Sequence, residues 1–145
     1  MSKNDYPELR RTYEDVMLGE TASRSRMISE KDIIAFAELI DDSNPVHLDA
    51  EYAKTTMFGE RIAHGMHSAS FFTTLIATRL PGIEGIYVSQ DLKFIRPVRI
   101  GDTITAQATV VEKNDAKRRL TLKTTVTNQR GEMVIDGKAV IAVMS

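Results

Sequence analysis

Apolar and polar side chains alternate along three runs in the second half of the chain. In the clearest run, Leu120 and Leu122 alternate with Thr121 and Lys123. Successive side chains of a strand point to opposite faces, so this period indicates an antiparallel sheet with one covered face and one wet face. Together with a fourth apolar run that precedes them, these patterns predict strands over residues 86–95, 104–110, 120–127 and 133–143.

Apolar residues recur at helical spacing in the first half of the chain. Ser29 has the features of an N-cap, and Asp32 lies three residues further on, as in a capping box. Ile33 and Phe36 then begin an apolar face. The pattern predicts a helix that starts after Ser29 and ends near Asp42. We also expect a short strand over residues 21–28 and a short helix capped by Asp49.

A second helix is predicted over residues 66–80, where Pro81 and Gly82 stop it. Its residues are small or apolar, and only Arg79 is formally charged. A helix without a charged face is usually buried on most sides. We therefore expect this helix to be central and the sheet to wrap around it.

One buried helix and one long, curved antiparallel sheet make an α+β architecture. The 145 residues suit a single domain. Residues 1–18 are polar with scattered apolar positions, and we interpret them as a loose N-terminal arm. The domain proper then covers residues 19–145.

Composition excludes several classes of function. The formal net charge of -1 does not favour a nucleic-acid or membrane-surface partner. The chain has no cysteine, which removes disulfides, thiolate nucleophiles and cysteine-based zinc sites. The N-terminus lacks an apolar signal region, and no apolar run approaches the roughly 20 residues that span a bilayer. The expected compartment is the cytosol.

The segment Asp42-Ser43-Asn44-Pro45-Val46-His47 is the best candidate for chemistry. Asn44-Pro45 signals a turn, and proline disfavours helical geometry in the residue before it. A sharp turn would let Asp42 and His47 converge, and a carboxylate beside an imidazole is the pairing that proton transfer needs. A solvated acid at a helix end and a surface histidine are the competing interpretation of the hexapeptide alone.

This hexapeptide, followed by Ala53, resembles the hydratase-2 motif of the MaoC-like (R)-specific enoyl-CoA hydratases. Two later segments are similar to that family as well, and the resemblance runs from about Gly19 to the end of the chain. Those segments are Ile62-Ala63-His64-Gly65-Met66 and Phe94-Ile95-Arg96-Pro97-Val98 with Gly101-Asp102.

The resemblance implies a hot-dog fold, a homodimer that could pair into a dimer of dimers, and an acyl-CoA thioester as substrate, without a cofactor. The implied reaction is the reversible, (R)-specific hydration of trans-2-enoyl-CoA. Many members have a small residue and then glycine just ahead of the catalytic aspartate, whereas this chain has Ile40 and Asp41. The spacing to His47 selects Asp42 over Asp41, which would be a solvated neighbour.

By similarity to the family, Asp42 and His47 would hold the attacking water, with His47 as base and Asp42 as acid. When two groups share a proton, the roles of acid and base need not belong to one residue each. Gly65 is expected at the start of the central helix, where a free N–H and the absence of a side chain suit an oxyanion donor. Asn44 would fix the turn or orient the site.

Other positions are candidates for substrate binding. His64 would contact the acyl-CoA or support the loop, and Thr73 with Ile76 would line the acyl tunnel or pack in the core. We expect no metal, because no metal-binding spacing is present. His67 has a smaller chance of touching substrate. The cations available for the CoA phosphates are Arg61, Lys93, Arg96 and Arg99.

Three alternative functions remain open. The same site could dehydrate (R)-3-hydroxyacyl-CoA or the acyl-carrier-protein thioester, because hydration is reversible. A thioesterase shares the hot-dog fold, but its usual acid on or near the central helix is missing from residues 66–80. A non-catalytic acyl-CoA-binding subunit would not need Asp42, His47 and Gly65 together.

Overall fold

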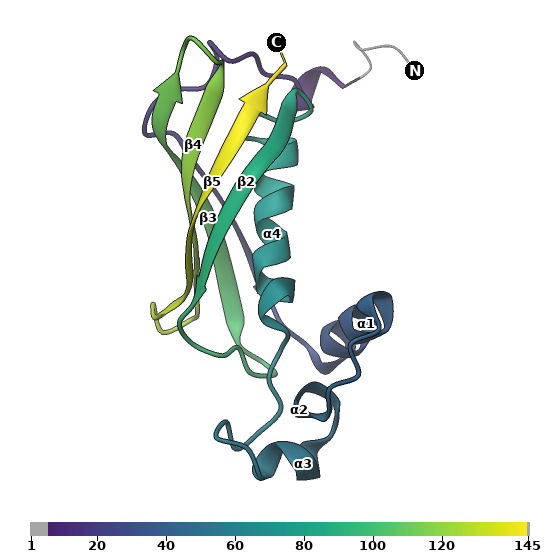
Figure 1. The fold of residues 1–145 in the computed structure, drawn as a ribbon. Coiled ribbons are helices and arrows are strands. Elements are labelled where there is room, and N and C mark those ends of the chain that lie inside the picture. The colour runs from purple at the N-terminus through teal and green to yellow at the C-terminus, as the bar shows by residue number, and fades with distance from the viewer. Residues whose placement is uncertain (1–5, 145) are drawn as a thin grey trace.

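The computed structural model describes residues 6–144 and shows one curved antiparallel sheet lying along one long helix (Figure 1). Three short helices gather at one end of that long helix (Figure 1). The strand order is β1-β3-β4-β5-β2. The strands are β1 (Thr21–Met27), β2 (Gly85–Phe94), β3 (Thr103–Asn114), β4 (Arg119–Thr127) and β5 (Met133–Val143).

Three helices lie where the sequence predicts them: α1 (Glu30–Ile40), α3 (Ala50–Lys54) and the long α4 (Gly65–Thr78). The short helix α2 (Pro45–Leu48) and the 3-10 turn η1 (Pro7–Leu9) were not predicted, since the first lies in the predicted turn and the second in the predicted arm. The α+β architecture is confirmed, and it is the hot-dog arrangement that the resemblance implies. Among the described residues, no helix combines the length and apolar character needed to cross a membrane.

Strand β3 is longer than predicted, because a bulge interrupts its alternating pattern. Val110 pairs with Leu122, but Glu112 pairs with Thr121, so the register shifts by one residue between them. A bulge inserts one extra residue and reverses the faces that follow it. The inside-outside period of the first half of the strand therefore does not continue into residues 111–114, although the pairing does.

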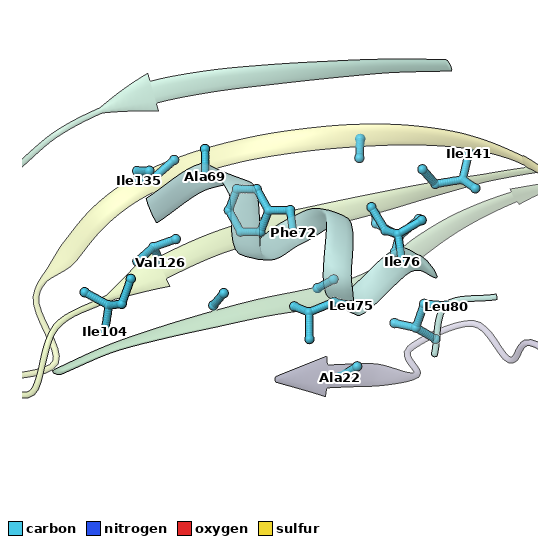
Figure 2. Packing of buried hydrophobic residues seen from close by; sticks show 14 of the residues in the cluster. Ala22, Ala69, Phe72, Leu75, Ile76, Leu80, Ile104, Val126, Ile135 and Ile141 are labelled. Carbon is cyan, nitrogen blue, oxygen red and sulfur yellow. The ribbon is translucent and has the colours of Figure 1, made fainter. Parts of the chain in front are cut away.

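The hydrophobic core lies between the inner face of the sheet and one side of α4 (Figure 2). Phe72, Leu75 and Ile76 of the helix are at most 3% exposed. They pack with buried strand residues that include Ile104, Leu120, Leu122, Ile135 and Ile141. Burying a side chain of this size stabilises the fold by roughly 1.5–3 kcal/mol.

Helix α4 is not surrounded as completely as its sequence predicts. Met66, Ser70, Thr73 and Ala77 are exposed, and their spacing puts them on one face of the helix. The described residues of this chain leave that face uncovered. The prediction of burial on most sides is wrong for a single chain, since the sheet covers one side of the helix only.

The N-terminal segment is docked and not loose, which corrects the prediction for its described part. Tyr13 is 4% exposed and Val16 is fully buried. Lys113 of β3 donates hydrogen bonds to the carbonyl oxygens of both residues, at 2.9 and 2.6 Å. Two isolated apolar side chains show no periodic pattern, so the sequence alone does not predict that this segment docks. Residues 1–5 of the predicted arm lie outside the described part.

Candidate active site

Helix α1 leads into the site and ends near Asp42, as predicted. Ser29 accepts a hydrogen bond from the Asp32 N–H, and Asp32 accepts one from the Ser29 N–H, so the capping box is confirmed. At the other end, Asp41 adopts a left-handed conformation with φ 57°. This conformation ends the helix, and the Asp42 N–H bonds back to the Ala37 carbonyl at 3.0 Å. Asp41 is exposed.

The turn after Asp42 is closed by two local hydrogen bonds. Asp42 Oδ1 accepts the N–H of Asn44 at 3.1 Å, and Asn44 Oδ1 accepts the N–H of Val46 at 3.1 Å. Asn44 thereby caps α2, whose first residue is Pro45. The turn places His47 in α2, on the same side as the Asp42 carboxylate. Asn44 itself is exposed, with its side-chain oxygen used by the turn.

His47 is 9% exposed, and its orientation is set by a backbone carbonyl. Its Nδ1 lies 2.7 Å from the oxygen of Ile62. A carbonyl only accepts, so Nδ1 donates its proton to Ile62, and in the neutral ring the lone pair is on Nε2. Nε2 lies 4.0 Å from Asp42 Oδ2. This separation exceeds a direct hydrogen bond, and one water molecule can bridge it.

His64 is the third member of the cluster and is 4% exposed. Its ring stacks on that of His47, with the centroids 3.7 Å apart and the planes inclined by 24°. Its Nε2 lies 3.6 Å from Asp42 Oδ2, while its Nδ1 has no partner among the described residues. Burial, followed by the neighbouring His47 ring, lowers the pKa of His64 below 6.5. His64 is therefore a neutral ring that packs on His47 and lies beside the Asp42 carboxylate.

The three side chains also raise the question of a metal ion. Asp42, His47 and His64 each offer a ligand atom, and these atoms all lie within 4.8 Å of one another. The imidazole rings are stacked with their planes inclined by only 24°, so their in-plane lone pairs lie in two separate layers. A tetrahedral ion needs lone pairs that converge on one point. The geometry suits proton transfer better than metal binding, and the absence of a metal stays a prediction.

Gly65 begins α4, so its N–H has no intrahelical partner. A Cβ at this position would lie 2.8 Å from two carbons of the Phe94 ring, too close for any larger residue without a shift. The absence of a side chain lets the ring of Phe94 approach the helix terminus. Gly65 and Phe94 share the wall of a pocket of about 460 Å³ with His64, Ser68, Val98 and Ile135.

Thr73 and Ile76 do not join this cluster within the chain, and the prediction that they line the acyl tunnel receives no support from its pocket. Ile76 is 3% exposed and belongs to the core, whereas Thr73 lies on the uncovered face of α4. Thr73 comes eight positions after Gly65 along the helix, a rise of roughly 12 Å. His67 is a packing residue whose ring stacks on Phe36 at 4.7 Å.

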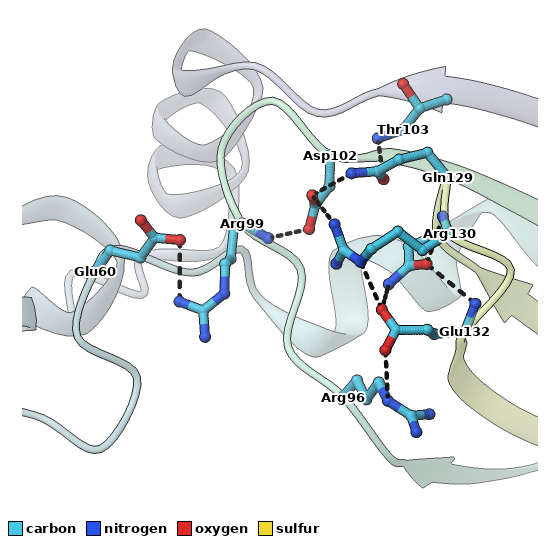
Figure 3. Close-up of polar contacts among 9 residues, drawn as sticks. Glu60, Arg96, Arg99, Asp102, Thr103, Gln129, Arg130 and Glu132 are labelled. Atoms are coloured by element: carbon cyan, nitrogen blue, oxygen red, sulfur yellow. Dashed lines mark hydrogen bonds and ion pairs between the residues drawn. The ribbon is translucent and has the colours of Figure 1, made fainter.

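The cations near the pocket are engaged by the protein itself. Arg61 donates to the His47 carbonyl at 2.7 Å and pairs with Glu30, so it holds the turn in place. Figure 3 shows the network in which Arg99 pairs with Glu60. The same network contains Arg96 and Arg130 with Asp102 and Glu132 (Figure 3). Lys93 is exposed.

Two residues of the pocket were missed by the sequence analysis. Ser68 has a buried hydroxyl in the pocket wall, and the ring of Phe94 lies against Gly65. Phe94 belonged to a matched segment without receiving a role. For Ser68 the available signal was its position one turn after Gly65, since residues three or four apart share a helix face.

Comparisons with known proteins place the chain among related sequences and structures. Residues 18–132 match the family model described as "MaoC like domain". The chain is 50% identical to an (R)-specific enoyl-CoA hydratase from Rhodospirillum rubrum, over 90% of each protein. It is 42% identical to a 3-hydroxybutyryl-CoA dehydratase from Methylorubrum extorquens, over 94% of this chain and 87% of the relative.

A solved structure is similar over most of its length. An unliganded R-hydratase from Pseudomonas aeruginosa superimposes with a TM-score of 0.85 at 45% sequence identity. The match covers 91% of this chain and 84% of that protein. The structural comparison and the sequence comparisons therefore agree, since both find hydratases.

Proposed function

Because the chain belongs to the MaoC-like domain family, we propose that it is a hydro-lyase that adds water reversibly to trans-2-enoyl-CoA and forms (R)-3-hydroxyacyl-CoA. The two relatives described above, at 50% and 42% identity, are named as a hydratase and a dehydratase. The observation that carries the proposal is the convergence of Asp42 and His47 at the N-terminal end of α4.

The two side chains would divide the proton transfers between them. The bond from Nδ1 to Ile62 leaves the Nε2 lone pair of His47 facing Asp42, which suits a general base. The water oxygen bonds to C3 while one of its protons passes to the Asp42–His47 pair. The pair returns a proton to C2 on the same face of the alkene, so that the addition is balanced. We assign His47 as base and Asp42 as acid.

Gly65 would stabilise the charge that develops on the thioester oxygen. Its N–H lies at the positive end of the α4 dipole, and the residue has no side chain of its own beside it. A donor fixed before the reaction needs no rearrangement as charge develops. Polarising the carbonyl makes C3 electrophilic and supports enolate character at C2.

The experiment that tests this proposal replaces each member of the pair and an adjacent acid. Asp42→Asn and His47→Gln should each lower crotonyl-CoA hydration by about 10²-fold or more, because each removes a proton-transfer group. Asp41→Asn, one residue away and exposed, is the matched control and should keep full activity. Loss of enoyl absorbance gives the rate, and circular dichroism checks the fold. Substantial activity in Asp42→Asn would contradict the assignment.

A dehydratase role is the second candidate, favoured by the relative named 3-hydroxybutyryl-CoA dehydratase. It uses the same site in the reverse direction, so both directions belong to one proposal. Rates measured from enoyl and from (R)-3-hydroxyacyl thioesters, on CoA and on acyl carrier protein, separate the carriers.

We also propose that the protein is a homodimer. Strand β2 is at the edge of the sheet, and among the described residues it pairs only with β5. Its Ile86 and Val88 are 48% and 45% exposed, and an open apolar edge is a template for pairing with a second copy. Sedimentation should give a two-chain mass, and Val88→Lys should shift it toward one chain. The cytosolic location stays a prediction.

A further inference from the structure

Ser68 has a buried hydroxyl group that no other described residue satisfies. The residue is 1% exposed, and its Oγ has no hydrogen-bond partner within residues 6–144. A serine inside a helix commonly bonds the carbonyl four residues back, which here belongs to His64. That bond is not made. Unpaired buried hydroxyls are rare because they oppose folding, so this one calls for a role outside folding.

Ser68 shares the pocket wall with Gly65, one helical turn earlier. Side chains of a helix lean toward its N-terminus, so the Ser68 hydroxyl lies over the turn that Gly65 begins. Most of the other wall residues are apolar. A polar substrate atom bound at this end of the pocket therefore meets few groups, among them the Gly65 N–H, the Ser68 hydroxyl and the His64 ring.

The partners of His64 leave Ser68 as the side-chain donor. His64 Nε2 faces the carbonyl and the carboxylate of Asp42, at 3.4 and 3.6 Å, and both of these groups accept hydrogen bonds. The proton of the neutral ring is therefore placed on Nε2, and Nδ1 is a bare acceptor. An acceptor cannot stabilise a substrate oxygen, whereas the hydroxyl of Ser68 can donate to it.

We propose that the Ser68 hydroxyl donates a second hydrogen bond to the thioester oxygen that the Gly65 N–H binds. The inference rests on the proposed function and adds a donor to it. Negative charge develops on that oxygen as water adds to C3, and a second fixed donor in an apolar pocket lowers the barrier further. The hydroxyl is unpaired in the free enzyme because its partner is the substrate.

The test compares Ser68→Ala with Ser70→Ala on the same helix. The Ser70 hydroxyl already donates to the His67 carbonyl at 2.5 Å, so its removal should leave hydration unchanged. Ser68→Ala should lower kcat for crotonyl-CoA about tenfold to a hundredfold with little change in KM, because the lost bond strengthens in the transition state. Ser68→Cys, a weaker donor, should be intermediate.

Two further measurements separate this role from a structural one. In an Asp42→Asn background, in which slow turnover should leave the bound substrate intact for the measurement, the Raman carbonyl frequency of bound crotonyl-CoA should shift less from its free value when Ser68 is also alanine. The unliganded Ser68→Ala protein should melt at the wild-type temperature or above, since an unpaired hydroxyl is lost.

Equal kcat in Ser68→Ala and wild type, or an unchanged carbonyl shift, would overturn the inference. So would a marked fall in the melting temperature of Ser68→Ala, which would show that the hydroxyl has a partner in the free protein. If the wild-type protein hydrates no enoyl thioester, the proposed function fails. An active wild type with an unaffected Ser68→Ala variant refutes only the second donor.

Discussion

Helix α4 contains different kinds of side chain at its two ends. At its start, buried nitrogen or oxygen atoms of His64, His67 and Ser68 have no hydrogen-bond partner among the described residues. Its second half instead packs against the sheet through Phe72, Leu75 and Ile76 (Figure 2). One continuous helix therefore joins a poorly satisfied polar end to a well-packed apolar end.

The contrast shows how the stabilities of the two ends are linked. Each unpaired buried polar group costs about 1–3 kcal/mol, and burial of apolar side chains offsets this cost. Function needs polar groups that are free to receive a substrate, so the packed half must hold the helix in place. Changes at the packed end should alter stability, and changes at the polar end should alter catalysis.

The largest expected effect is on stability, from Phe72→Ala at the packed end. Phe72 is 1% exposed, and its removal leaves a cavity, so the free energy of unfolding should fall by roughly 3–5 kcal/mol. Chemical denaturation measures the loss. Arg79→Gln, at an exposed site past the end of the helix, should change stability by less than about 0.5 kcal/mol. Equal losses in both variants would remove the contrast.

Gly65→Ala should act mainly on catalysis, at the polar end. The added methyl would lie 2.8 Å from the Phe94 ring, so the ring or the helix terminus must move. We expect hydration to fall at least roughly tenfold, because a small displacement misaligns a fixed donor. The steady-state rate measures this effect. The double variant Gly65→Ala with Phe94→Leu should recover part of the activity if contact with the ring is the cause.

The smallest effect concerns pH. Burial lowers the pKa of His64 below 6.5, and burial also lowers that of His67. As pH falls through about 6.5, the unfolded chain binds protons on these rings before the folded protein does. The contribution of these two neutral rings to stability is therefore complete above this pH and decreases below it. Melting temperatures measured on both sides should show a shallower loss in His67→Gln, and identical slopes would contradict the assignment.

Much of the fold could be predicted from local patterns. The alternation of Leu120, Leu122 and Val126 identified β4, and Ser29 with Asp32 identified the start of α1. These features depend on neighbours in the sequence, so local pattern is sufficient for them. The docking of Tyr13 and Val16 was not predicted, because it depends on Lys113 in a distant strand.

The candidate site divides in the same way. The Asn44-Pro45 turn is local, and it correctly indicated that Asp42 and His47 approach each other. The stacking of His64 on His47 joins residues 17 positions apart, and no spacing rule predicts it. The positions of Thr73 and Ile76 on different sides of α4 also depend on which face the sheet covers.

The sequence by itself determined the positions of most strands and helices, and that an acid and an imidazole meet at a turn. Only the tertiary structure decided that His64 joins them, that the Phe94 ring lies against Gly65, and that Ser68 lines the pocket with a hydroxyl that has no partner among the described residues. The physical reason is the distance along the sequence over which each interaction acts. Propensity, capping and turn chemistry act within a few residues, whereas burial and the choice of hydrogen-bond partner depend on the packing of distant segments.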